Sequence, residues 1–166
     1  MRLILCLLYI ILMGGVSHHV GEALPRGWFS PGERPFTPCK WEKNGKVYEK
    51  IGVHRWKDKL PDMSKFAKKM VRKSISLTGS WEDAARVAME TCVAECVHWA
   101  LMLLSFLIYL INPTPLGAVI AIVYALSHVP FIIIQRYNRP TLHRLALRLR
   151  EREMRRKNSS EYDGGT

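Results

Sequence analysis

The chain has 166 residues, 48% of them hydrophobic, and a formal net charge of +11. An excess of Lys and Arg of this size is common in proteins that bind nucleic acid, but here the apolar residues are gathered into long runs. The composition therefore argues against nucleic acid as a partner and favours a membrane protein.

The first apolar run, Leu3–Val20, is long enough for a bilayer-spanning helix. A short positive start followed by an apolar stretch also describes a secretory signal peptide. Because no A-x-A-like cleavage site follows Gly14 and Gly15, we favour a retained N-terminal transmembrane anchor over residues 1–20.

Residues 21–80 are predicted to form a cytoplasmic loop with interfacial helices. Four prolines and three glycines within residues 21–40 predict an irregular stretch. We expect its Trp28, Phe29 and Phe36 to touch the membrane interface, where aromatic rings are favoured.

Two helices are expected later in this segment. Val47, Tyr48 and Ile51 recur at helical spacing and predict a short helix, with Gly52 in the place of a C-terminal cap. The stretch Asp62–Ile75 carries apolar residues on one face among lysines. This predicts a basic amphipathic helix that lies on an anionic membrane surface or packs on its own domain.

The second and third apolar runs predict a transmembrane hairpin over residues 81–135. We expect one continuous helix from Trp81 to about Ile111 and a second spanning helix over Leu116–Gln135. The turn between them carries no Lys or Arg, whereas residues 21–95 carry 15 and the tail from Arg136 carries 9. Since positive loops stay in the cytoplasm, the turn is placed outside the cell.

After the hairpin, residues 136–157 are predicted to form a separate basic amphipathic helix along the membrane surface. Pro140 suits its first turn, and Leu142, Leu145 and Leu149 give it an apolar stripe. Residues 158–166 read as a disordered tail. The expected fold class is an all-α integral membrane protein with about three transmembrane helices and basic amphipathic helices on the cytoplasmic side.

Glu95 and His98 are the first candidates for chemistry. They lie three residues apart on one face of the predicted helix, together with Trp99. Ionisable groups at membrane depth are costly, and an adjacent carboxylate can orient an imidazole and stabilise its protonated form.

The hairpin brings further polar residues to this level. A turn near residues 113 and 114 places His98 level with about residue 129, so His128 can be its neighbour, and Gln135 lies on the same face as His128. This predicts a polar pocket of Glu95, His98, His128 and Gln135, rimmed by Arg136 and Arg139. Two other interpretations stay open: these groups only hold the helices together, or Glu95, His98 and His128 bind a metal ion without an evident fourth ligand.

The cysteines indicate neither a zinc site nor a disulfide framework, because Cys6 and Cys39 lie apart and Cys92 and Cys96 lack the usual spacing. We expect all four to be reduced.

Two polar stretches flank the hairpin. In HRWKDKLPD, His54 and Asp58 face each other if the segment is helical, as weaker catalytic candidates. Trp56 and Lys57 suit an interface anchor and a phosphate or carboxylate contact. In QRYNRP, Gln135 to Pro140, two arginines at a membrane exit can bind an acidic head group or the phosphates of a thioester cofactor, or merely set the topology.

Three stretches in this order resemble the glycosyl-4,4'-diaponeurosporenoate acyltransferase family: W-K-D-x-L-P from Trp56, A-E-x-x-H-W from Ala94, and V-P-x-I-I-x-Q-R-Y-N-R-P from Val129. The resemblance runs from about Trp41 to Leu142. It implies a small bacterial membrane enzyme of carotenoid glycolipid synthesis that transfers a fatty acyl chain to a sugar hydroxyl. The matching positions are Trp56, Lys57, Glu95, His98, Trp99, Gln135, Arg136, Tyr137, Asn138 and Arg139.

Chemistry assigns the roles that the resemblance leaves open. We expect His98, supported by Glu95, to take the proton of an acceptor hydroxyl, which attacks the carbonyl of an acyl thioester such as acyl-CoA or an acyl carrier protein adduct. Arg136, Asn138 and Arg139, assisted by Lys57, would bind donor phosphates or the developing oxyanion. No bound cofactor or metal is expected, and a direct transfer is favoured over an acyl-enzyme.

The expected setting is the cytoplasmic side of a bacterial cell membrane, with membrane lipids, a glycolipid acceptor and the acyl donor as partners. A non-catalytic membrane adaptor and a metal-dependent lipid enzyme are the competing classes.

Overall fold

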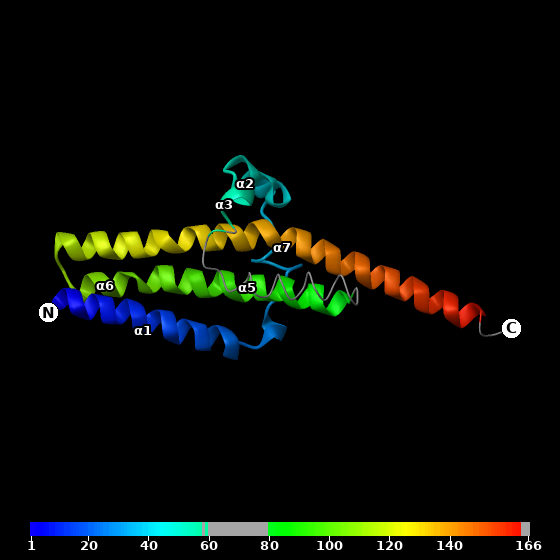
Figure 1. Ribbon diagram of the computed structural model, residues 1–166, viewed down its shortest axis with the longest axis horizontal. Coiled ribbons are helices and arrows are strands. Elements are labelled where there is room, and N and C mark those ends of the chain that lie inside the picture. The colour runs from blue at the N-terminus through cyan, green and yellow to red at the C-terminus, as the bar shows by residue number, and fades with distance from the viewer. Residues whose placement is uncertain (58, 60–79, 164–166) are drawn as a thin grey trace.

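The computed structural model describes residues 1–57, 59 and 80–163, and three long helical rods lie side by side in it (Figure 1). They are α1 (Arg2–Ala23), α5 (Trp81–Leu104) continued by α6 (Phe106–Ile111), and α7 (Pro115–Asp163). Each rod is long and apolar enough to cross a membrane. No strand occurs in the described residues. The predicted all-α membrane fold with three spanning helices, one of them N-terminal, is confirmed.

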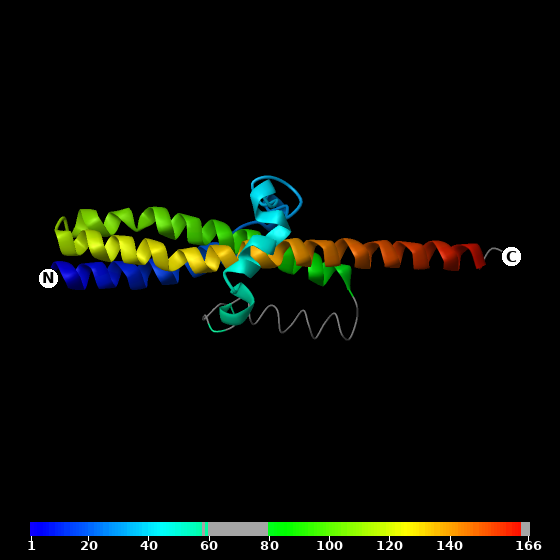
Figure 2. The same ribbon diagram turned by 90° about the horizontal axis from the view of Figure 1, so that it is seen from above.

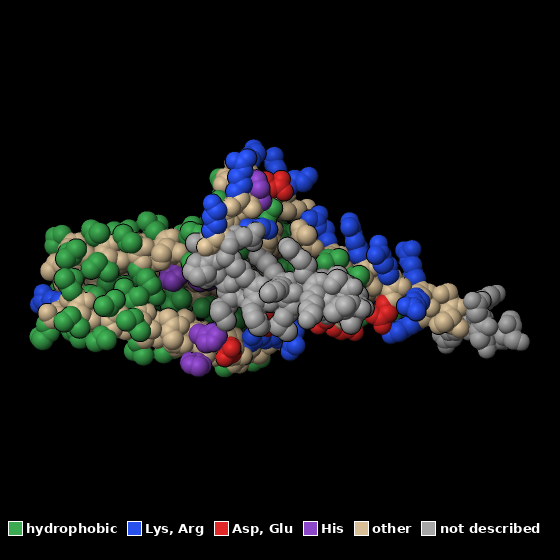
Figure 3. Space-filling model, viewed as in Figure 1, with side chains coloured by type: hydrophobic (Ala, Val, Ile, Leu, Met, Phe, Trp, Pro, Cys, Tyr) green, Lys and Arg blue, Asp and Glu red, His purple; other side chains and the backbone are tan. Residues whose placement is uncertain are grey.

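The three rods pack through a small apolar core at the end that holds the N-terminus and the turn between α6 and α7 (Figures 1 and 2). Cys6, Ile108 and Ala121 bring α1, α6 and α7 together there. The Tyr9 hydroxyl donates to the Leu104 carbonyl at 2.9 Å. Hydrophobic side chains cover the outside of this half (Figure 3). Such a surface is stable in lipid and not in water, which fits spanning helices.

The turn of the hairpin is closed by hydrogen bonds from its own side chains. The Gly117 amide donates to the Thr114 hydroxyl at 3.2 Å, and that hydroxyl donates to the Asn112 side-chain oxygen at 3.1 Å. Pro115 then occupies the first position of α7, where its missing N–H costs nothing. The turn thus lies where the sequence places it.

Gly117 is required by the close approach of the backbone in this turn. A Cβ added to Gly117 would lie 1.8 Å from the Asn112 carbonyl oxygen, a distance at which the backbone must move. We expect Gly117→Ala to destabilise the protein by more than about 1 kcal/mol. Thermal unfolding in detergent measures this. Gly14→Ala is the matched control, since nothing lies within 4 Å of a Cβ there; equal melting temperatures for the two variants would contradict the prediction.

The second rod is nearly continuous, as expected from Trp81 to about Ile111. It is interrupted only at Ser105, whose backbone stays helical and whose hydroxyl donates to the Met102 carbonyl at 2.6 Å.

The third rod departs from the prediction of a separate helix beginning at Pro140. α7 is one helix of 49 residues that contains both Pro130 and Pro140, and it continues through residues 158–163, where a disordered tail was expected. A proline inside a helix removes one backbone hydrogen bond. Beyond Pro140, Ala146 is buried and Arg150 lies over the Trp81 ring of α5, and turning the chain onto the membrane surface would lose both contacts. Residues 136–157 therefore extend the spanning helix instead of forming a surface helix.

A small lobe, residues 40–57, sits against α7 (Figure 1). It consists of the 3-10 helix η2 (Lys40–Gly45), α2 (Lys46–Lys50) and α3 (Val53–Trp56). Its Tyr48 and Val53 form an apolar cluster with Ile134 of α7. The predicted short helix is present as α2, and Gly52 takes the left-handed conformation (φ 66°) after it. The amphipathic helix predicted at residues 62–75 lies outside the described residues.

Between α1 and the lobe, the chain is irregular except for one 3-10 turn, η1 (Arg26–Trp28), as predicted. The expectation that Trp28, Phe29 and Phe36 touch the membrane interface is wrong for Phe29 and Phe36. Trp28 is 74% exposed, whereas Phe29 and Phe36 are buried against Cys92 and Val93 of α5. Burial of these two rings ties the segment to α5. All four cysteines, each of which the structure describes, are free thiols.

Candidate active site

The centre of the site is a buried carboxylate, Glu95 of α5, held between two arginines of α7. Arg136 Nη1 donates to Glu95 Oε1 at 2.7 Å, and Arg139 Nη2 donates to Glu95 Oε2. Trp99, one turn along α5, donates from Nε1 to Glu95 Oε1 at 3.4 Å. Two guanidinium groups therefore neutralise one carboxylate at the junction of the two longest rods.

Arg139 is the most enclosed of these charges, at 1% exposed. Its Nε donates to the Thr91 hydroxyl at 2.9 Å, its Nη2 to the Thr91 carbonyl at 2.9 Å, and its Nη1 to the Phe36 carbonyl at 3.0 Å. The Phe36 ring lies against the guanidinium, 5.2 Å from its centre. These contacts join α7, α5 and the segment after α1, so Arg139 holds the site together from inside.

Arg136 is shared between Glu95 and a second acid, Glu42 of the lobe. Its Nε and Nη2 donate to the two oxygens of Glu42 at 2.6 and 2.7 Å, a bidentate pair. The Tyr48 hydroxyl and the Cys39 amide also donate to Glu42. Glu42 is 1% exposed. Two acids and two arginines thus alternate in one chain of contacts that fixes the lobe to α5 and α7.

The titration of Glu42 is set by these partners. Burial by itself would raise the pKa of Glu42, but the hydrogen bonds from Arg136, Tyr48 and the Cys39 backbone outweigh burial and lower the pKa from 4.5 to about 2. Burial, and after it the Glu42 carboxylate, raises the pKa of Tyr48. Tyr48 therefore remains a protonated donor at neutral pH.

A pH-dependent stability follows from the lowered pKa of Glu42. A carboxylate whose folded pKa lies below its unfolded pKa stabilises the fold above the unfolded value, and this stability is lost as the pH falls toward the folded value. The melting temperature in detergent should therefore fall between pH 4.5 and about pH 2. Glu42→Gln should melt lower at neutral pH and depend less on pH in this window. Glu33→Gln, at an exposed carboxylate of the same segment, should keep the wild-type profile; a Glu42→Gln profile parallel to the wild type would contradict the assignment.

The imidazole of His98 lies on α5 one turn from Glu95, and the structure pairs it with His128 of α7. The two Nδ1 atoms are 3.2 Å apart, so that one ring donates a hydrogen bond and the other accepts it. The Phe131 ring stacks on His98 at 4.7 Å, and the Tyr124 ring meets His128 edge-on at 4.7 Å. His128 is 7% exposed, and its Nε2 has no hydrogen-bond partner among the described residues.

This arrangement modifies the expected role of Glu95. Both Glu95 oxygens accept hydrogen bonds from arginines, because the two guanidinium groups of α7 reach the carboxylate from the neighbouring helix. The imidazole partner that the structure gives to His98 Nδ1 is His128. The predicted pocket is thus two adjoining groups on the same two helices, the imidazole pair and the Glu95 cluster, with the fully buried Gln135 beside Arg136 on α7.

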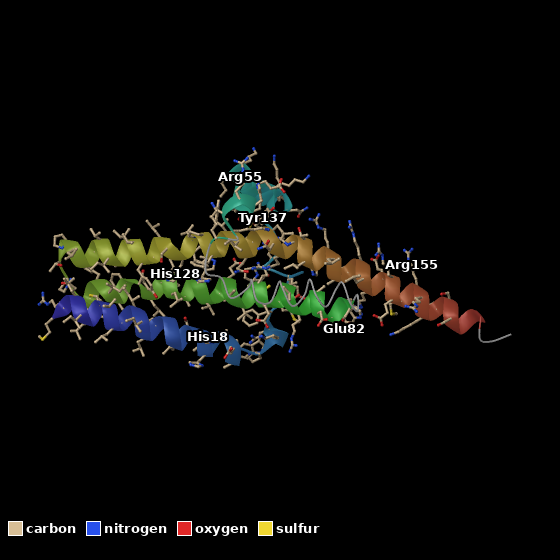
Figure 4. All side chains as sticks on the ribbon, viewed as in Figure 1. His18, Arg55, Glu82, His128, Tyr137 and Arg155 are labelled. Carbon is tan, nitrogen blue, oxygen red and sulfur yellow. The ribbon has the colours of Figure 1, made fainter. Side chains whose placement is uncertain are left out.

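The lobe brings a further cation to α7 near this cluster. Lys57 Nζ lies 4.9 Å from the centre of the Tyr137 ring and donates to the Asn138 side-chain oxygen at 3.4 Å. Asn138 in turn donates to the Ile134 carbonyl at 2.8 Å. Trp56 packs at the edge of the same apolar cluster as Tyr137. Figure 4 shows the lobe above Tyr137, whereas His128 lies nearer the turn, between α7 and α5.

Of the two weaker candidates, His54 is exposed on α3, and Asp58 lies outside the described residues. The described ranges also contain no group of three or more His, Cys, Asp or Glu side chains that could hold a metal ion.

The site contains residues that the sequence patterns did not point to, namely Glu42, Tyr48, Thr91 and the Phe36 carbonyl. Glu42 is one of two acids, with Glu49, in the basic stretch 40–50, so the local sequence does not single it out. Its partner Arg136 is 94 positions away, and no local periodicity reveals such a pair.

Comparison with known proteins places all of these residues inside one match. A family model described as glycosyl-4,4'-diaponeurosporenoate acyltransferase matches residues 25–148. Relatives of that name from Staphylococcus aureus are 31% identical over 150 residues (strain Newman) and 28% identical over 148 residues (strain MRSA252), in each case over 89% of both chains. No solved structure shows a significant match. The chain therefore belongs to the glycosyl-4,4'-diaponeurosporenoate acyltransferase family.

Proposed function

We propose that this protein is a membrane O-acyltransferase that esterifies a sugar hydroxyl of a glycosylated carotenoid, or of a related glycolipid, with a fatty acyl chain from a thioester donor. The family and the names of the relatives support an acyltransferase over a non-catalytic adaptor. The observation that carries the proposal is the placement of the His98 and His128 pair beside the buried Glu95, Arg136 and Arg139 cluster.

In the proposed reaction, His98 is the general base. It takes the proton of the acceptor hydroxyl as the hydroxyl oxygen bonds to the thioester carbonyl carbon. The carbon–sulfur bond then breaks, and the proton leaves with the sulfur as a free thiol. His128 is the positioning partner, since its hydrogen bond at 3.2 Å fixes the orientation and tautomer of the His98 ring.

Charges on α7 and in the lobe would stabilise the negative charge that develops on the carbonyl oxygen. Arg136, whose side chain is 16% exposed, and Lys57 are the cations with access to a ligand. Asn138 supplies an amide next to Lys57. Arg139 and Glu95 would act by positioning these groups rather than by binding substrate. Their hydrogen bonds are already made to each other and, from Arg139, to Thr91 and Phe36. Trp56, Trp99 and Tyr137 would complete the proposed substrate-binding surface, whereas Gln135 and His128, also predicted from the sequence to bind substrate, are buried.

The proposed site suits a reaction between a lipid and a polar donor. The apolar part of α7 ends at Ile134, directly before Gln135 and Arg136, so the site lies at the level where hydrocarbon gives way to head groups. The Lys and Arg of the lobe and of the end of α7 favour the cytoplasmic side of a bacterial cell membrane. An acyl chain can lie in lipid there while its thioester meets the acceptor sugar.

Expression in a bacterium that makes the glycosylated carotenoid but lacks an acyltransferase for it tests the function. Mass spectrometry of the extracted lipids should show the glycoside gaining the mass of one fatty acyl ester, and mild alkali should remove it. A vector without the gene is the control. An unchanged glycoside in cells that contain the protein, inserted in the membrane, would refute the proposed reaction.

A further inference from the structure

The extension of α7 beyond the site carries a row of arginines on one face. Arg144, Arg148, Arg152 and Arg155, which we call the basic row, follow one another at intervals of four, four and three residues. Side chains at this spacing lie above one another on a helix. All four are exposed, and Figure 3 shows Lys and Arg side chains standing in a row along this part of α7.

The basic row is not neutralised by the rest of the described chain. The ion pair on the extension joins Lys157 to Glu153 at 2.7 Å, and Arg150 lies over the Trp81 ring of α5. Within the described ranges, none of the four arginines of the row forms an ion pair. Like charges spaced by four residues destabilise a helix. The arrangement is therefore suited to an acidic partner from outside the chain.

The position of the row favours a soluble partner over the membrane surface. α7 continues past Gln135 without a break, so at 1.5 Å per residue Arg144 lies about 13 Å and Arg155 about 30 Å along the helix from the end of the apolar segment. The head-group layer is only about 5–8 Å thick, and salt screens charges beyond about 8 Å. Most of the row is therefore out of reach of lipid head groups when α7 stands across the bilayer.

The row also has the wrong shape for a small anion. Arg144 and Arg155 are eleven residues apart, or about 17 Å, which is three helical turns. A cluster of phosphates on a free cofactor is recognised by cations that converge, whereas a straight row of this length matches the acidic face of a helix. The lobe with Lys57 lies on the same side of α7 (Figure 3), so a protein bound to the row would lie on the side of α7 that carries Lys57.

We infer that the basic row docks an acidic acyl carrier protein, which presents the acyl thioester to the site. This inference rests on the proposed function, and it names the donor class. Charge complementarity along the row would raise the rate of encounter and orient the carrier, while the thioester itself is recognised at His98 and Lys57.

The test compares two donors on the full-length protein in phosphatidylcholine nanodiscs. Palmitoyl-acyl carrier protein and palmitoyl-CoA are each supplied with the glycosylated acceptor. Arg148→Glu/Arg152→Glu is the row variant. Arg34→Glu/Arg86→Glu is the matched control, with the same change in net charge at exposed arginines outside α7. Binding of holo-acyl carrier protein, measured by biolayer interferometry, gives a readout that does not depend on turnover.

We expect the row variant to raise KM for the carrier-bound donor at least tenfold, with kcat changed less than twofold and with CoA-donor rates unchanged. The wild-type KM should rise with salt, and binding of the carrier should weaken in the row variant alone. Equal effects in the row and control variants, or equal effects on both donors, would overturn the docking inference. An effect seen only when phosphatidylglycerol is added to the nanodiscs would overturn it as well. Transfer from neither donor by the wild type would overturn the proposed function itself.

Discussion

Replacing His98 by Ala is expected to abolish ester formation while the protein stays folded and inserted. General base catalysis contributes roughly 10²–10⁴-fold to a rate, and the His98 ring is the imidazole of the pair that is partly accessible. The loss should appear in kcat, measured as acylated glycolipid formed per unit of membrane-inserted protein. Because the change removes a hydrogen bond to the buried His128 and the stacking on Phe131, the melting temperature should fall moderately while the protein stays folded.

His54→Ala is the matched control for this experiment, since it removes an imidazole that is exposed on the lobe. It should retain wild-type activity. A His98→Ala protein that keeps more than about a tenth of the wild-type rate would exclude His98 as the base. An adaptor without catalytic activity would instead give variants that bind lipid as the wild type does and form no ester in any case.

Replacing Glu95 by Gln is expected to cause the largest loss of stability. The change leaves Arg136 and Arg139 facing a neutral amide, and Arg139 is 1% exposed. Arg136 keeps Glu42 as a partner, but Arg139 is left with neither water nor a counter-ion. Removing one partner of a buried ion pair in this way costs about 3–5 kcal/mol. Thermal or denaturant unfolding in detergent measures the effect.

Glu90→Gln provides the comparison at a more accessible ion pair. Glu90 pairs with Arg26 at 2.9 Å, but the two side chains are 35% and 28% exposed, so its loss should cost about 1 kcal/mol or less. Combining Glu95→Gln with Arg139→Met should cost less than the sum of the two single changes. Additive costs, or equal effects at Glu95 and Glu90, would show that the buried cluster does not hold α5 to α7.

The spanning helices and the meeting of His98 with His128 follow from patterns that are local along the chain. Apolar runs of sufficient length define the rods, and a turn at Pro113 and Thr114 places the two histidines level by counting residues from it. Both inferences use a helix geometry that hardly varies. This is why they could be made from the sequence.

The partners of the charged side chains could not be predicted from such local patterns. Glu95 was expected to serve His98, three residues along the same helix, but the arginines of α7 bind its carboxylate. Charge-assisted pairs across helices are stronger than a contact with a neutral imidazole, and their geometry depends on how α5 and α7 are rotated. Phe36 differs from expectation for a related reason, because its burial depends on Arg139 and α5 lying beneath it.

Pro140 shows how packing can outweigh a local signal. A proline next to a membrane exit usually begins or ends a helix. In this chain the residues just before it are fastened to α5 and to the lobe, and the helix continues for more than twenty residues afterwards.

The contact between Glu42 and Arg136 has a consequence for biosynthesis. The two residues are 94 positions apart, so the ribosome releases the segment containing Glu42 long before it makes the helix that carries Arg136. Until that helix has been inserted into the bilayer, Glu42 lacks its partner Arg136, and residues 40–57 cannot close onto α7. Residues 40–57 can therefore pack against α7 only after α7 has been inserted into the membrane.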